Sequence, residues 1–101
     1  MNLIDYQGNV IRLTDERLKH IMEHPEMVMH TDKINETLSH PDRVIKSQSD
    51  NEARLYYRKY EGLSIGDKYL CIVVKFKPED AFVITTYFTD SIKKGDVLWK
   101  K

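Results

Sequence analysis

Hydrophobic and polar residues alternate with a period of two through the second half of the chain, which is the pattern of β-strands. The clearest segments are Tyr69–Phe76 and Phe82–Thr89, and Val44–Ser49 and Arg54–Tyr60 follow the same pattern. Short links that contain Gly, Pro or polar residues join consecutive segments, which favours an antiparallel meander. The second half therefore predicts a four-stranded antiparallel sheet.

The first half of the chain predicts a small hairpin and two helices. Leu3–Tyr6 and Val10–Leu13 flank a Gln-Gly-Asn turn, which indicates the hairpin. Thr14 is a suitable N-cap for a first helix that Pro25 helps to end, and Thr31 caps a second helix. The expected fold class is α+β, with two N-terminal helices packed on the four-stranded sheet.

Composition indicates a single globular domain over residues 1–101, with 41% hydrophobic and 32% charged residues. The 16 basic residues balance the 16 acidic residues, and this neutrality counts mildly against strong non-specific nucleic-acid binding. A single cysteine, Cys71, excludes an internal disulfide. No apolar run approaches the length of a membrane span and no signal-peptide pattern is present, so we expect a cytoplasmic protein with no membrane partner.

One face of the predicted sheet carries candidate catalytic groups. Alternation places Lys75, Thr85 and Tyr87 on the side opposite the apolar positions of the last two long strands. A cation, a hydroxyl and a phenol can support phosphodiester chemistry without a metal. They are also ordinary on a solvated antiparallel sheet, where threonine and aromatic residues are common.

The segment Arg54–Tyr60 adds candidate substrate-binding residues to that face if its register agrees. Arg54 and Arg58 can hold phosphate through their guanidinium groups, and Tyr56 between them can stack on a base of single-stranded RNA. The alternative is a set of solvated cations that pair with nearby carboxylates.

The histidines of the first helix are candidate acids or bases, because imidazole titrates near neutral pH. His20 and His24 are four residues apart and lie beside the apolar stripe of the helix, although His24 also precedes a proline as part of a helix stop. The same spacing can chelate zinc, but residue 21 is Ile where a metalloprotease motif needs Glu, and no third ligand is evident. We therefore expect no metal site.

The order of the motifs resembles a known group of domains. Thr14–Arg17, His20–Ile21 and His24–Glu26, followed by Leu70–Lys75 and Val83–Tyr87, are similar to small phage- and mobile-element-associated domains. These domains belong to the barnase–EndoU–colicin–RelE-like nuclease superfamily. The resemblance extends over most of the chain, and the motifs that carry it are short.

The resemblance implies metal-independent RNA cleavage on an antiparallel sheet, with no cofactor. It assigns roles to a helix histidine, to basic strand residues and to a hydroxyl pair on the last long strand. By position these are His20, Arg54 or Arg58 with Lys75, and Thr85 with Tyr87. It also implies RNA as the ligand and a cognate antitoxin or immunity protein as a partner.

Two functions remain open at the level of sequence. The preferred one is an endoribonuclease, a toxin or phage-borne effector in which the ribose 2′-hydroxyl attacks the adjacent phosphate. His20 or His24 would be the base or acid, with Tyr87 as its partner. The alternative is a non-catalytic module that binds RNA or a protein through the same sheet face, and a structural or dimerising role follows if neither activity exists.

Overall fold

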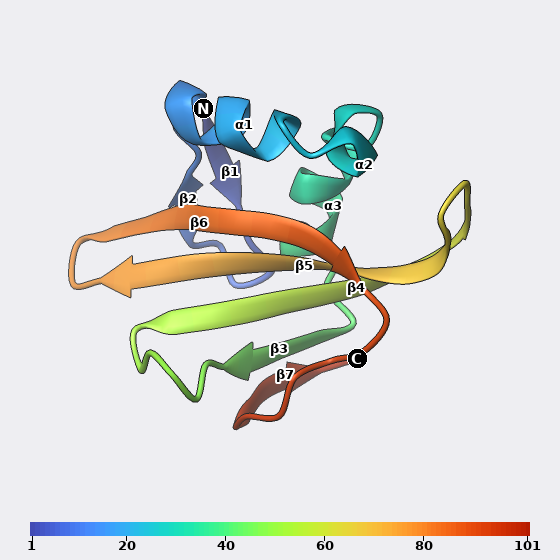
Figure 1. Ribbon diagram of the computed structural model, residues 1–101. Helices are drawn as coiled ribbons and strands as arrows, with labels where there is room; N and C mark the ends of the chain where they lie inside the picture. The colour runs from blue at the N-terminus through green and yellow to red at the C-terminus, as the bar shows by residue number, and fades with distance from the viewer.

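The computed structural model describes all of residues 1–101 and shows one curled, mixed sheet with three short helices on one of its faces (Figure 1). The strand order is β1-β2-β6-β5-β4-β3-β7, so the first and last strands of the chain form the two edges. The strands are β1 (Asn2–Ile4), β2 (Val10–Arg12), β3 (Arg43–Lys46), β4 (Ala53–Leu63), β5 (Gly66–Lys77), β6 (Asp80–Thr89) and β7 (Val97–Lys100). The helices are α1 (Asp15–Met22), α2 (Pro25–Val28) and α3 (Asp32–Ser39).

The N-terminal hairpin is confirmed, and a buried carboxylate holds its turn. Asp5 accepts hydrogen bonds from the backbone N–H groups of Gln7 and Asn9 and from the side chain of Asn9. Gly8 has φ of +86°, which a residue with a Cβ rarely adopts. The turn therefore fixes the register in which Leu3 lies opposite Ile11.

The caps of the helices agree with the sequence at Thr14 but not at Pro25, and Thr31 precedes α3 without making a capping hydrogen bond through its side chain. The Arg17 backbone N–H donates to the hydroxyl of Thr14, so Thr14 is the N-cap of α1. Pro25 lies beyond the end of α1 and begins α2, where its missing N–H costs no intrahelical bond. The first half of the chain therefore contains three short helices, where two were predicted.

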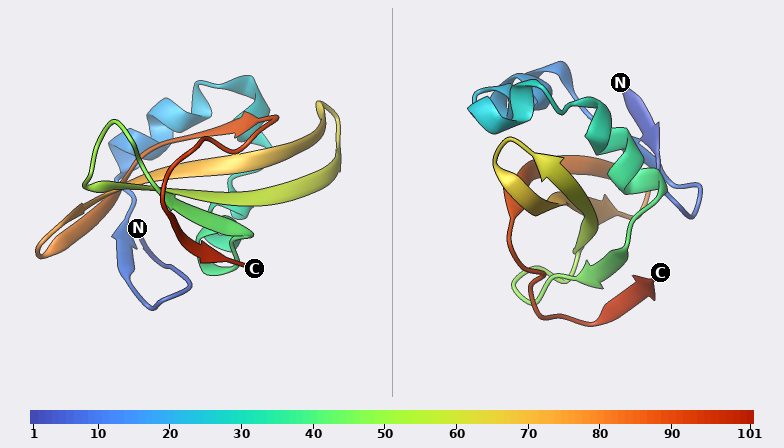
Figure 2. Two further views of the ribbon diagram at one scale, coloured as in Figure 1. Left: turned by 90° about the horizontal axis from the view of Figure 1, so that it is seen from below. Right: turned by 90° about the vertical axis from the view of Figure 1, so that its right-hand side faces the viewer.

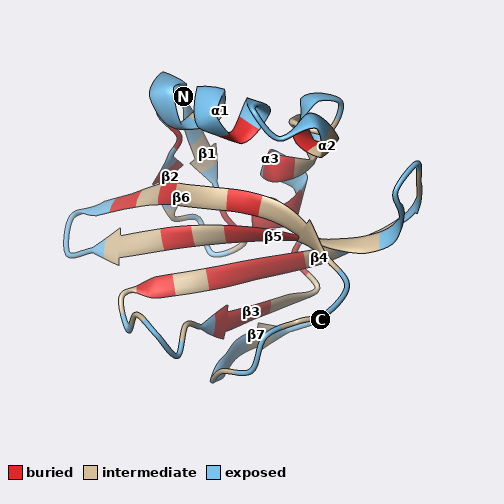
Figure 3. Ribbon diagram, in the orientation of Figure 1, coloured by how far each residue is buried: buried red, intermediate tan, exposed pale blue.

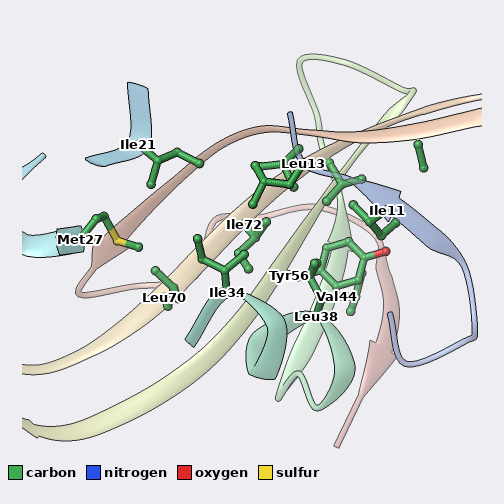
Figure 4. Close-up of a cluster of buried hydrophobic side chains, with 13 residues drawn as sticks. Ile11, Leu13, Ile21, Met27, Ile34, Leu38, Val44, Tyr56, Leu70 and Ile72 are labelled. Atoms are coloured by element: carbon green, nitrogen blue, oxygen red, sulfur yellow. The ribbon is translucent and has the colours of Figure 1, made fainter. Parts of the chain in front are cut away.

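The main core lies between the helices and the sheet (Figure 4). Ile21 of α1 and Met27 of α2 pack with Ile34 and Leu38 of α3 onto the sheet, and Tyr56 is fully buried among them. Burial of each large apolar side chain stabilises the fold by about 1.5–3 kcal/mol. This cluster is the principal source of stability.

The fold class predicted from the sequence is wrong in the size and connectivity of the sheet. The structure has seven strands in a mixed sheet, whereas the prediction has four antiparallel strands beside a separate hairpin. The hairpin joins the sheet because β2 runs parallel to β6 at Arg12 and Phe82. At the other edge β7 pairs with β3, where Trp99 lies opposite Val44. Alternation identifies strands, but it does not identify partners that are distant in sequence.

The face of the sheet away from the helices also carries a buried cluster. Leu55, Tyr57 and Cys71 are buried there with Ile45. Figure 3 shows that buried stretches run along β4 and β5. The segment between β6 and β7 crosses this face, and its Ile92 packs on the cluster. The views in Figure 2 show how strongly the sheet curls around this side, which we call the concave face.

A bulge in β6 corrects the side of the sheet that alternation predicts for Val83. Val73 lies opposite Thr85, but Val74 lies opposite Val83, so the register shifts at Ile84. Val83 therefore lies on the helix-covered face, although alternation predicts the other side.

None of the helices is long and apolar enough to cross a membrane.

Candidate functional site

The structure places the three strand residues predicted as catalytic on one face, as alternation indicates, but they are not free. Lys75 and Thr85 lie on the concave face with Tyr87. The ammonium group of Lys75 forms an ion pair with Asp50 and lies 3.5 Å from a carboxylate oxygen of Glu52. These carboxylates raise the pKa of Lys75 and leave it engaged within the protein.

Tyr87 lies against the small buried cluster of the concave face. It is opposite Cys71, and Lys93 lies with its Nζ 6.0 Å from the ring centroid. Burial raises the pKa of Tyr87, and it raises the pKa of the neighbouring Tyr57 to about 12. Both phenols are therefore protonated at neutral pH, and burial also raises the pKa of the Cys71 thiol, which makes it a poor nucleophile.

The three residues predicted to bind substrate lie on the opposite, helix-covered face, which corrects the expected register of β4. Arg54, Tyr56 and Arg58 lie opposite Val74, Ile72 and Leu70, so they share the core-facing side of the sheet. The register of the β4–β5 hairpin decides this, because a shift of one residue exchanges the two faces.

Each of these three side chains has a partner inside the protein. The guanidinium group of Arg54 lies 4.0 Å from the ring centroid of Phe76. The phenol of Tyr56 is buried and donates to Asp5 over 2.6 Å. Arg58 reaches the C-terminal end of α3, and it is the only one of the three that lines a cavity.

The predicted catalytic histidines lie in the helical layer and point to solvent. His20 lies 3.7 Å from Glu23, and His24 lies 3.9 Å from Glu26. Both imidazoles are more than half exposed. Because the helices cover one face of the sheet, these imidazoles are separated by the sheet from Lys75 and Tyr87. The residues selected from the sequence therefore do not converge on a single site.

A different set of residues converges at the edge of the helical layer. A cavity of about 320 Å³ opens between the end of α3, the β1–β2 hairpin and β7, and we call it the His40 pocket. Its volume is at the lower end of the range for ligand sites. It is lined by Tyr6, Ser39, His40, Pro41, Arg58, Trp99 and Lys101.

The Ser39 hydroxyl contacts the imidazole of His40 at the mouth of the pocket. The Ser39 hydroxyl donates its one proton to the carbonyl oxygen of Asn35 over 2.9 Å. The hydroxyl also lies 3.1 Å from Nδ1 of His40, and the direction of that hydrogen bond depends on the tautomer of the imidazole. The tautomer in which Nδ1 donates to Ser39 keeps a lone pair on Nε2, which is the atom that a general base uses.

The other walls of the His40 pocket supply charge and aromatic surface. Arg58 donates to the carbonyl oxygen of His40 over 2.6 Å, and its Nε lies 3.6 Å from Glu36. The rings of Tyr6 and Trp99 lie with their centroids 5.3 Å apart at 48° and form one aromatic wall. Burial and the nearby Asp5 carboxylate raise the pKa of Tyr6.

A second hollow adjoins the pocket at the end of β7, and we call it the Lys59 hollow. Lys101 lines both cavities. The second cavity has a volume of about 290 Å³, and Asp42 is its only carboxylate. It is lined by Asp42, Arg43, Lys59, Tyr69, Ile92, Lys100 and Lys101.

No group of three or more His, Cys, Asp or Glu side chains is placed to hold a metal ion.

No family model matches the chain, and no curated protein or solved structure is significantly similar to it. The superfamily resemblance of the motifs therefore stays a prediction, and the chemistry of the two cavities carries the functional argument.

Sequence reasoning missed most of the His40 pocket. His40 precedes Pro41 at the end of α3, and in the sequence this pair indicates only a helix stop. Trp99 is recognisable as a residue that packs the C-terminal segment, but its partner Tyr6 is 93 positions away. Of the residues selected from the sequence, Arg58 is the one that lines this pocket.

Proposed function

We propose that the protein binds single-stranded RNA at the His40 pocket and cleaves it without a metal ion. The observation that supports this is the meeting of an accessible imidazole, a guanidinium, an ammonium and two aromatic rings in one cavity. Aromatic rings stack on unpaired bases, and cations hold the phosphate backbone. RNA as the ligand fits a cytoplasmic location, and a cognate antitoxin or immunity protein would be the partner of a toxin.

The pocket offers a complete set of groups for transesterification. Nε2 of His40 takes the proton of the ribose 2′-hydroxyl, whose oxygen attacks the adjacent phosphorus. Arg58 and Lys101 stabilise the negative charge that grows on the phosphate. The phenol of Tyr6, which its raised pKa keeps protonated, gives a proton to the leaving 5′-oxygen. The products are a 2′,3′-cyclic phosphate and a 5′-hydroxyl.

The test is cleavage of a labelled single-stranded RNA in the presence of EDTA. We expect His40→Gln to lower the cleavage rate by about 10²- to 10⁴-fold, which is the usual contribution of a general base. Arg12→Gln, whose side chain forms a surface ion pair with Asp80, is the matched control and should cleave like the wild type. Circular dichroism of each variant checks that the fold is retained.

A double variant, His20→Gln with His24→Gln, separates this site from the one that the resemblance implies. Retained cleavage in the double variant supports the His40 pocket. Loss of cleavage in the double variant, with full activity in His40→Gln, would move the site to the helical layer and contradict our assignment.

RNA binding without cleavage is the second candidate. It is favoured by Arg58, whose guanidinium already engages Glu36 and the His40 carbonyl and is therefore less available to a transition state. RNA affinity that falls in Arg58→Gln, with no cleavage by the wild type in EDTA, would select this candidate. Absence of both affinity and cleavage would contradict both functions.

A further inference from the structure

Three of the four cations of the Lys59 hollow differ from most cations of the sheet because they lack carboxylate partners, whereas the fourth, Lys101, lies 3.9 Å from Asp42. Lys68, Lys75 and Lys77 each form an ion pair with an aspartate or a glutamate. Arg43, Lys59 and Lys100 form none, although they line one cavity. Four cations beside the single carboxylate of Asp42 leave the hollow with an excess of positive charge, so the hollow is suited to an anion.

Two details make the Lys59 hollow more specific than a basic patch. Nε of Arg43 is buried and donates to no group in the protein. Guanidinium N–H groups that have no partner in the protein can donate hydrogen bonds to the oxygens of a phosphate. Tyr69 also lines the hollow, and the ammonium group of Lys59 lies 5.9 Å from the centroid of its ring. The hollow therefore combines a site for phosphate with a ring on which a base can stack.

The two cavities lie on opposite sides of the sheet edge and meet at the end of β7. Trp99 lies opposite Val44, whose neighbour in β4 is the core residue Tyr56, so Trp99 is on the helix-covered side. Arg43 lies opposite Tyr57, which faces the concave side. Lys101 lines both cavities and lies at the crossing point.

We infer that the ligand is a strand of at least two nucleotides that passes over the end of β7. One base lies against Tyr6 and Trp99, with its phosphate between Arg58 and Lys101. The next phosphate lies in the Lys59 hollow, and the base that follows stacks on Tyr69. This inference rests on the proposed RNA binding, and it defines a minimum length and a path for the RNA.

The test uses the His40→Gln variant, so that the bound strand is not cleaved. Trp99 is the only tryptophan, so quenching of its fluorescence reports on the His40 pocket directly. Adenosine monophosphate, a dinucleotide with two phosphates and a trinucleotide are titrated at several salt concentrations. We expect the dinucleotide to bind at least about tenfold tighter than the mononucleotide, because it adds a charge-assisted contact.

Substitution of Lys59→Gln together with Lys100→Gln removes two of the cations that form the second site and leaves the buried Arg43 in place. We expect this variant to lose the gain with length and to bind the mononucleotide as before. The slope of log affinity against log salt for the trinucleotide should fall by about 0.7, which is the value for one lost phosphate contact on a single strand. Arg17→Gln with Lys19→Gln removes the same charge from α1 and should leave the slope and the length dependence unchanged.

Each outcome separates the inference from the proposed function. Quenching by the mononucleotide with no gain for longer strands would overturn the inference and leave the His40 pocket in place. A gain with length that survives Lys59→Gln with Lys100→Gln would also overturn it. No quenching and no binding by any strand would contradict both. Lys59→Arg with Lys100→Arg keeps the charges, so recovery of tight binding in that variant excludes a simple loss of folding.

Discussion

The two faces of the sheet are both buried, but they are buried in different ways. The helix-covered face contributes to a cluster of thirteen buried residues that involves three helices, whereas the concave face holds a cluster of four beneath a single crossing segment. Because both faces are covered over most of their area, RNA can reach the concave face only at the Lys59 hollow. The groups that remain available lie at the sheet edge, where the helical layer ends beside β7.

Tyr56 and Tyr57 show the difference in two adjacent residues of one strand. Tyr56 points into the main core and donates a 2.6 Å hydrogen bond to the carboxylate of Asp5. Tyr57 points to the concave face, where its oxygen accepts the backbone N–H of Lys93 over 3.2 Å. The first contact joins the sheet to the N-terminal hairpin, and the second joins it to the crossing segment alone.

Alkaline pH should have the largest effect, because it acts on both faces together. Burial raises the pKa of Tyr56 and Tyr60 on one side and of Tyr57 and Tyr87 on the other. A raised pKa means that folding favours the protonated phenol. The resulting stability is complete below pH 10.0, the ordinary tyrosine value, and is lost as the pH rises through the value of about 12 for Tyr57. Urea unfolding followed at increasing pH measures the loss.

Tyrosine variants divide this alkaline loss between the faces. Tyr57→Phe with Tyr87→Phe removes the two concave phenols, and Tyr56→Phe with Tyr60→Phe removes the two on the helix-covered side. Each double variant should lose stability with pH less steeply than the wild type. An unchanged steepness in both would show that other groups control the alkaline transition.

Val73 and Val74 allow the same truncation on opposite faces. Val74 is fully buried in the main cluster, while Val73 is partly exposed on the concave face. We expect Val74→Ala to lower the free energy of unfolding by about 2–3 kcal/mol and Val73→Ala by about 1 kcal/mol, because a cavity is left only where packing is complete. Equal losses in urea unfolding would contradict the difference in packing.

Removal of one phenol oxygen at a time gives a smaller contrast. We expect Tyr56→Phe to cost about 1.5–3 kcal/mol, since it removes a buried hydrogen bond to a carboxylate. Tyr57→Phe should cost about 0.5–1.5 kcal/mol, since it removes a neutral hydrogen bond to the backbone. Thermal unfolding of the two variants at neutral pH measures both costs, and a larger loss in Tyr57→Phe would reverse the comparison.

The smallest effect is expected at a pair that belongs to neither face. Arg12 and Asp80 form a 2.8 Å ion pair at the junction of β2 and β6, and both side chains are nearly half exposed. Arg12→Gln should leave the free energy of unfolding nearly unchanged, as is usual for exposed surface pairs. A loss comparable to that of Val74→Ala would show that the hairpin depends on this pair for its attachment.

The sequence predicts the local elements of this fold better than their assembly. The Gln-Gly-Asn turn, the Thr14 cap and the alternation in β5 each depend on neighbours in sequence, and each is confirmed. The pairing of β7 with β3 and of β2 with β6 depends on contacts that no local pattern contains. The predicted sheet is therefore too small at both edges.

The candidate site follows the same division. Lys75, Thr85 and Tyr87 share a face as alternation predicts, because they lie on strands joined by a short turn. Arg54 and Arg58 lie on the other face, because the register of a long hairpin cannot be read from polarity when both faces are buried. The His40 pocket draws on four distant segments, and only a folded chain reveals that they meet.

The attachment of β7 has a consequence for the order in which the molecule assembles. Strands β4, β5 and β6 pair with their neighbours in sequence, whereas pairing of Trp99 with Val44 must close a loop of more than fifty residues. Closing such a loop costs more chain entropy, so we expect β7 to dock late. Its amides should also exchange with solvent hydrogen faster than those of β5. Both cavities would then open by local unfolding before the rest of the sheet does.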